Sequence, residues 1–110
     1  MMLGLRVAVA TSLVVPIAVA AQSPSRMADT KAVEAVLSEY KAAIEKLDAT
    51  GTERLFAADS QIFETGGSEG TYATYLAHHL GPELAAFRSF NFSDYKVSVR
   101  FEGPVALATG

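Results

Sequence analysis

The sequence predicts an α+β protein, and three observations support this class. Residues 30–48 carry apolar side chains at three- and four-residue steps, which is the period of an amphipathic helix. Residues 89–102 alternate apolar and polar side chains, which is the period of a strand. Turn residues separate the stretches, at Gly66-Gly67 and at Gly103-Pro104. We therefore expect helices in the first part of the chain and antiparallel strands in the last part.

The start of the chain, residues 1–21, has the pattern of a removable export signal. One positive charge, Arg6, precedes an apolar run over residues 7–21 that is shorter than the roughly 20 residues of a spanning helix. Ala18-Val19-Ala20 fits the small-x-small rule for cleavage. We expect a periplasmic or secreted mature chain with no stable membrane anchor after cleavage. An uncleaved anchor is the alternative.

Composition narrows the classes of function. Hydrophobic residues make up 50% of the chain, which excludes wholesale disorder. The net charge is −3 and the sequence has no basic patch, so no nucleic-acid partner is expected. The chain has no Cys, which excludes disulfides, a thiol nucleophile and a thiolate metal site.

The mature chain opens with an expected extended linker over residues 22–29. Asp29 or Thr30 can cap the helix predicted for residues 30–48. The apolar face of that helix consists of Val33, Val36, Leu37, Tyr40, Ile44 and Leu47.

A capping box predicts the next helix. Thr50 stands at the cap position and Glu53 three residues later, which predicts a short helix over residues 53–57. Residues 61–64 then form a short strand that stops at a tight turn over residues 66–70.

A third helix should begin at a Thr71 cap. Its apolar face consists of Tyr72, Tyr75, Leu76, His79 and Leu80. Gly81-Pro82 should interrupt this helix, and residues 83–87 add one further turn because Pro is favoured at a first helical position.

The final stretch predicts a long bent strand. Apolar positions shift from even to odd numbers between Phe92 and Tyr95, so a bulge near Ser93-Asp94 is needed to keep both sets on one face. A return strand follows over residues 105–109. Two strands do not normally make a stable sheet, so we expect the domain to be incomplete at its C-terminal side or to borrow strands from a partner.

The order of these elements and four segments resemble the SnoaL-like branch of the nuclear transport factor 2-like superfamily. The segments are Tyr40-Lys41-Ala42-Ala43-Ile44, Leu55-Phe56-Ala57-Ala58-Asp59-Ser60-Gln61-Ile62-Phe63-Glu64, Gly70-Thr71-Tyr72-Ala73-Thr74-Tyr75-Leu76 and His79-Leu80-Gly81-Pro82-Glu83-Leu84. The resemblance implies a domain over residues 30–110 with a cone-shaped fold. In that fold, N-terminal helices pack on a curved antiparallel sheet around a pocket, and here the last strands would be missing.

The ketosteroid isomerase branch of this superfamily uses a Tyr of the first helix as an oxyanion donor and an Asp of the first strand as a base. The resemblance places Tyr40 at the first position, but Thr65 stands at the second. A hydroxyl cannot take a proton from carbon unaided near neutral pH, and strand alternation points Glu64 to the opposite face. The catalytic residues therefore stay unknown, with His79 and Tyr40 as candidates.

His79 shares the apolar face of its helix, so we expect it to point inward and to be the more buried of the two histidines. It can be a buried imidazole bonded to a backbone carbonyl, a base or substrate contact in the pocket, or a metal ligand with Glu64. The expected ligand pocket consists of Tyr40, Phe63, Tyr72, Tyr75, His79, Phe90, Phe92 and Tyr95.

Three functions remain open. The first is an exported domain that binds a small apolar or amphipathic molecule, without a cofactor, and forms a homodimer through its sheet. The second is a His-dependent enzyme, isomerase or hydrolase-like, that acts on a small organic substrate. The third is a metal-binding accessory protein that uses His79 and Glu64.

Overall fold

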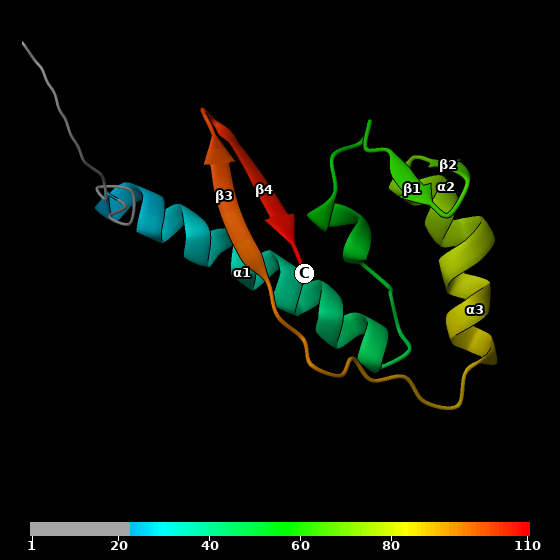
Figure 1. The fold of residues 1–110 in the computed structure, drawn as a ribbon. Coiled ribbons are helices and arrows are strands. Elements are labelled where there is room, and N and C mark those ends of the chain that lie inside the picture. Colours follow the sequence, from blue (N-terminus) through cyan, green and yellow to red (C-terminus); the bar gives the residue numbers. More distant parts are fainter. Residues whose placement is uncertain (1–22) are drawn as a thin grey trace, which may run out of the picture. The chain divides into compact units, whose positions relative to one another are not determined.

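The computed structural model describes residues 23–110, and over this range the protein is α+β with two small antiparallel sheets (Figure 1). Its elements are α1 (Pro24–Glu45), the 3-10 turn η3 (Thr52–Leu55), β1 (Ile62–Glu64), β2 (Gly67–Gly70), α2 (Tyr72–Tyr75), the π-helical turn η4 (Leu76–Leu80), α3 (Gly81–Ala86), β3 (Ser98–Glu102) and β4 (Val105–Thr109). The predicted export signal, residues 1–21, lies outside the described residues. A boundary between two compact units falls within α1, and the packing described below belongs to the unit of residues 32–110.

The first helix begins earlier than the sequence predicts. Pro24 is its first residue, where the absence of an N–H costs nothing. The Ser23 hydroxyl oxygen accepts a hydrogen bond from the Arg26 backbone N–H at 3.2 Å, which is the bond that an N-cap makes. The expected extended linker over residues 22–29 is therefore wrong from Pro24 onward, and the caps expected at residues 29–30 lie inside the helix.

The end of α1 has the hydrogen bonds of a Schellman motif. The Leu47 N–H donates to the Ile44 carbonyl at 2.9 Å, and the Asp48 N–H donates to the Ala43 carbonyl at 3.1 Å. Leu47 has a φ of 60°, the left-handed conformation that usually requires Gly at this position. Its side chain packs against the core, which offsets that strain. The helix therefore ends at Glu45 rather than at residue 48.

The predicted short helix is confirmed as the turn η3, but its predicted cap is wrong. The residue before η3 is Gly51, in the left-handed conformation with a φ of 82°, and no side chain caps the turn. Thr52 rather than Thr50 supplies a hydroxyl to this part of the fold. Its side chain is buried and is hydrogen-bonded to the Ala49 carbonyl and the Tyr72 hydroxyl.

Strand β1 is confirmed, and it pairs with a strand that the sequence does not signal. β1 and β2 are antiparallel, with Ile62 opposite Gly70 and Glu64 opposite Gly67. Gly66 makes the turn with a φ of 90°. β2 consists of Gly, Ser and Glu alone, so neither β-propensity nor alternation could mark it as a strand.

The cap at the start of α2 is confirmed, since the Thr71 side chain accepts a hydrogen bond from the Thr74 N–H. The predicted interruption at Gly81-Pro82 is wrong. The chain stays helical through η4 into α3, and the Gly81 N–H donates to the Leu76 carbonyl five residues earlier. A Cβ at Gly81 would lie 2.7 Å from that carbonyl oxygen, so the π-helical turn requires Gly at this position.

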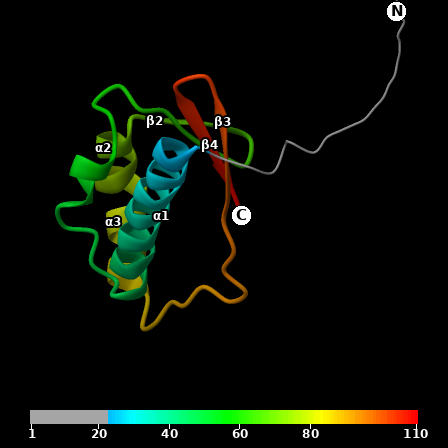
Figure 2. The ribbon, with the colours of Figure 1, turned by 90° about the vertical axis from the view of Figure 1, so that its left-hand side faces the viewer.

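The long bent strand expected over residues 89–102 is only partly present. β3 covers Ser98–Glu102, and residues 87–97 run without regular secondary structure from α3 to β3 (yellow to orange in Figure 2). The backbone does change direction at the predicted place, where Asp94 has a φ of 52°. No strand of the described chain pairs with residues 89–97, so the irregularity is a bend in a loop rather than a bulge in a ladder.

The return strand is confirmed. β3 and β4 pair in full register, from Ser98 opposite Thr109 to Glu102 opposite Val105. The two-residue turn is Gly103-Pro104, and Gly103 has a φ of 59° as a tight hairpin requires. The predicted alternation of β3 is present, with its apolar side chains half-buried and its polar ones exposed.

The core lies among the helices and the β1–β2 hairpin. Its buried side chains are Ile44, Ala49, Thr52, Tyr72, Tyr75, Leu80 and Leu84. The partly buried side chains packed against them are Tyr40, Leu47, Phe56, Ile62, Leu76 and Phe90. This core fixes the positions of the tyrosines that the candidate site uses.

Candidate functional site

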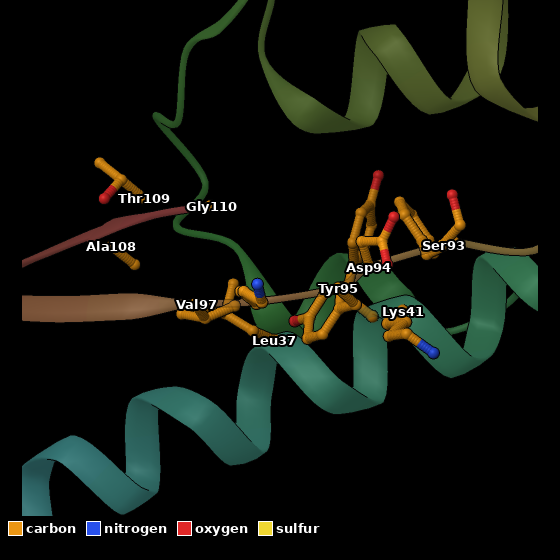
Figure 3. A pocket seen from close by; sticks show the side chains of 12 residues that line it. Leu37, Lys41, Ser93, Asp94, Tyr95, Val97, Ala108, Thr109 and Gly110 are labelled. Atoms are coloured by element: carbon orange, nitrogen blue, oxygen red, sulfur yellow. The ribbon is translucent and has the colours of Figure 1, made fainter.

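Five of the eight residues predicted for a pocket line two hollows that share Leu37 and Tyr40 of α1. The first, which we call the hairpin hollow, has a volume of about 460 Å3 and lies between α1, residues 92–97 and the end of β4 (Figure 3). The predicted pocket residues Phe92 and Tyr95 line it together with Tyr40.

The second, which we call the tyrosine hollow, has a volume of about 410 Å3. The residues of its lining that the argument uses are Val36, Tyr40, Phe56, Phe63, Glu64 and Tyr75. The predicted pocket residues Tyr40, Phe63 and Tyr75 therefore come together here.

Two charged side chains of α1 hold the wall of the hairpin hollow. Lys41 Nζ lies 2.9 Å from Glu45 Oε1 and 5.2 Å from the centre of the Tyr95 ring. Glu45 Oε2 accepts a hydrogen bond from the Phe92 backbone N–H at 2.9 Å. Hydrogen bonds from Lys41 and then from Phe92 lower the pKa of Glu45. Figure 3 shows Lys41 and Leu37 on one face of α1, beside Tyr95 and Val97.

A chain of hydroxyl groups lies behind Tyr40, and its direction is fixed. Thr52 Oγ1 is 2.6 Å from the Ala49 carbonyl oxygen and 2.7 Å from the Tyr72 hydroxyl oxygen. A carbonyl carries no proton, so Thr52 must donate to Ala49 and Tyr72 must donate to Thr52. The Tyr40 ring lies edge-on to the Tyr72 ring, with centres 6.0 Å apart. Tyr72 and Thr52 therefore each give their only proton toward the interior.

The third tyrosine of the site donates to a carboxylate. The Tyr75 hydroxyl lies 2.7 Å from Glu64 Oε2, and it is the donor because an ionised carboxylate only accepts. Burial and then this carboxylate raise the pKa of Tyr75. Burial and then Tyr72 raise the pKa of Tyr40. Both hydroxyls are therefore held neutral, and the proton of Tyr75 is already engaged by Glu64.

The family resemblance implies that Tyr40 acts as an oxyanion donor, and the hydrogen bonds of the tyrosines test this role. An oxyanion donor must aim its proton at the substrate. Tyr40 lines both hollows, whereas the proton of Tyr75 is directed at Glu64, so Tyr40 rather than Tyr75 is the tyrosine of the site that can take this role.

The position predicted for His79 is wrong. Its side chain is 45% exposed and lines neither hollow. The cause is the π-helical turn, which places Leu80, five residues after Tyr75, on the buried face that His79 would occupy in an α-helix. His79 Nε2 lies 2.8 Å from Glu69 Oε1, and its ring stacks on Tyr75 with centres 5.9 Å apart.

Sequence reasoning missed Glu69, because it lies on the strand β2 that the sequence does not signal. The metal candidates do not come together as expected, since Glu64 bonds to Tyr75 and His79 to Glu69. Within residues 23–110, no group of three or more His, Asp or Glu side chains could hold a metal ion.

Two further expected pocket residues lie elsewhere. Tyr72 is 1% exposed and stacks on Phe56 with ring centres 3.7 Å apart, so it belongs to the core behind Tyr40. Phe90 packs against that core and lies between the rings of Phe87 and Phe92. Neither lines either hollow.

Comparisons with known proteins give no relative, since no protein-family model, curated protein or solved structure matches this chain significantly. Across residues 23–110, none of the helices combines the length and the apolar character needed to cross a membrane.

Proposed function

We propose that this protein is an exported domain of the SnoaL-like type that binds a small apolar or amphipathic molecule. One observation carries the proposal: aromatic and aliphatic side chains line two adjoining hollows on either side of Leu37 and Tyr40. Hollows of this size suit small organic ligands, and apolar surface predominates in both of them.

The cone-shaped fold and the homodimer belong to the same proposal. Helices followed by antiparallel strands agree with a cone, in which a curved sheet would cover Leu37 and Tyr40. Both strands of the β3–β4 hairpin have an unpaired edge within the described chain, and Val105 and Leu107 of β4 are exposed. Pairing of such edges between two copies would extend the sheet and satisfy the unpaired backbone groups. The predicted export signal supports a periplasmic or secreted location.

Binding of the neutral apolar dye Nile red tests the proposal. Wild-type protein should enhance the dye's fluorescence saturably. Leu37→Arg should abolish the enhancement, because Leu37 lines both hollows and a charge there opposes an apolar ligand.

Ala35→Arg is the matched control, since Ala35 is exposed on the same helix and lines neither hollow. Thermal unfolding of both variants shows whether each is folded. If a folded Leu37→Arg variant binds Nile red like wild type, the hollows are not the binding site.

A further inference from the structure

Two of the three polar side chains that line the tyrosine hollow can accept hydrogen bonds but have none to donate. Tyr75 gives its proton to Glu64. The carboxylate of Glu64 is an acceptor throughout. A polar group of a ligand that enters this hollow therefore meets the lone pairs of Glu64 and Tyr75.

The hollow also carries an uncompensated negative charge. Glu64 is the charged residue in its lining. Within residues 23–110, no Lys, Arg or His forms an ion pair with it, and its bonded partner is the neutral hydroxyl of Tyr75. Glu64 is exposed, so a ligand with a positive charge can reach its carboxylate and form an ion pair with it.

Apolar side chains stand exposed at the edge of the same hollow. Phe63 is 73% exposed and Val36 is 41% exposed, although both line it. Aromatic faces attract organic cations, so Phe63 can cover a cationic head as well as an apolar body.

We propose that the tyrosine hollow binds an organic ammonium ion with an apolar body. The ammonium group donates to Glu64 and to the oxygen of Tyr75, and the apolar body lies against Phe56 and Phe63. The inference rests on the proposed function, and it names the class of ligand that one of the two hollows selects.

Three probes that share a body and differ in the head group test the inference: 2-phenylethylammonium, 2-phenylethanol and 3-phenylpropionate. Calorimetric titration of the full chain should rank them ammonium, alcohol and carboxylate in falling affinity. We expect the ammonium to bind at least about tenfold more tightly than the alcohol, because it makes charge-assisted hydrogen bonds. Equal affinities, or tightest binding of the carboxylate, would overturn the inference.

Glu64→Gln should lower the affinity for the ammonium at least about tenfold and change that for the alcohol by less than about twofold. The matched control is Glu69→Gln, which removes a carboxylate of the same hairpin that lines neither hollow. The control should change neither affinity. Loss of ammonium affinity in Glu69→Gln equal to that in Glu64→Gln would show a diffuse effect of charge and contradict the site.

A measurement on the wild type guards against misfolding of the variant. Added salt should weaken binding of the ammonium and leave binding of the alcohol unchanged. Nile red separates the two proposals. If the dye binds but the ammonium is not preferred, the inference fails and the proposed function stands; if neither the dye nor any probe binds, both fail.

Discussion

The helical region of residues 44–84 and the C-terminal region of residues 87–110 are organised in different ways. All the buried side chains of the described chain belong to the first region, although its β1–β2 pairing is short and irregular. The second region contains a five-pair hairpin in regular register and no buried side chain. In this molecule, regular pairing of strands therefore does not coincide with burial of side chains.

Different kinds of contact hold the two regions in place. In the first, aromatic rings stack and hydroxyls bond in the interior, around Tyr72. In the second, Lys41 and Glu45 of α1, which are accessible to solvent, contact Phe92 and Tyr95. We therefore expect substitutions in the first region to cost more stability than equivalent substitutions in the second.

The largest expected effect comes from truncation of a tyrosine in each region. Tyr72→Ala should lower the free energy of unfolding by about 3–5 kcal/mol, because it removes a buried ring and leaves a cavity. Tyr95→Ala should cost about 1 kcal/mol or less, because Tyr95 is 40% exposed. Urea unfolding followed by circular dichroism measures both. Similar losses in the two variants would contradict the comparison.

A smaller effect should follow from loss of one buried hydroxyl. Thr52→Val removes the group that links Tyr72 to the Ala49 carbonyl, so we expect a loss of about 1–3 kcal/mol. Thr50→Val is the control, since Thr50 is exposed and its side chain caps nothing, and it should be nearly neutral. The same unfolding assay applies. A larger loss of stability for Thr50→Val than for Thr52→Val would contradict this and support the capping box that the sequence predicts.

Substitution of two glycines tests the π-helical turn. Gly81→Ala should destabilise by about 1–3 kcal/mol, because the new methyl group meets the Leu76 carbonyl. Gly67→Ala should cost less than about 0.5 kcal/mol, since nothing lies within 4 Å of a Cβ there. Thermal unfolding distinguishes them. If Gly81→Ala melts like wild type, the turn can relax to an ordinary helix.

The smallest effect concerns pH and the C-terminal region. The pKa of Glu45 is lower in the folded protein than its ordinary value of 4.5, so its contribution to stability is complete above that value. The contribution is lost as the pH falls below about 4.5 and through the folded pKa. The NMR signal of the Phe92 amide should shift over this range as its acceptor becomes protonated. In Glu45→Gln the shift should disappear, and its persistence would point to another carboxylate.

The elements with a strong period were predictable from the sequence. α1, β1, the helical stretch from Thr71 and the β3–β4 hairpin all follow local patterns of apolar residues, caps and turns. The aromatic residues of the two hollows were largely predictable for the same reason, since Tyr40 and Phe92 are members of such patterns. The cone and the family membership remain proposals.

What could not be predicted depends on contacts between distant residues. β2 exists because it pairs with β1, and no local signal marks it. Thr52 rather than Thr50 is the hydrogen-bonded threonine because its hydroxyl pairs with Tyr72, twenty residues further along the chain. His79 was misplaced because a single π-helical turn changes which residue is buried, and no periodic pattern in the sequence marks that turn.

The π-helical turn also determines how the chain can change in length. The buried row passes from Tyr75 to Leu80 and then to Leu84, in steps of five and four residues. Deletion of the exposed residue Ala77 would make both steps four, which is the spacing of an ordinary α-helix. The same three side chains would stay buried, and Gly81 would no longer be required. An insertion at Ala77 would instead rotate Leu80 and Leu84 out of the core, so this helix can lose a residue more easily than it can gain one.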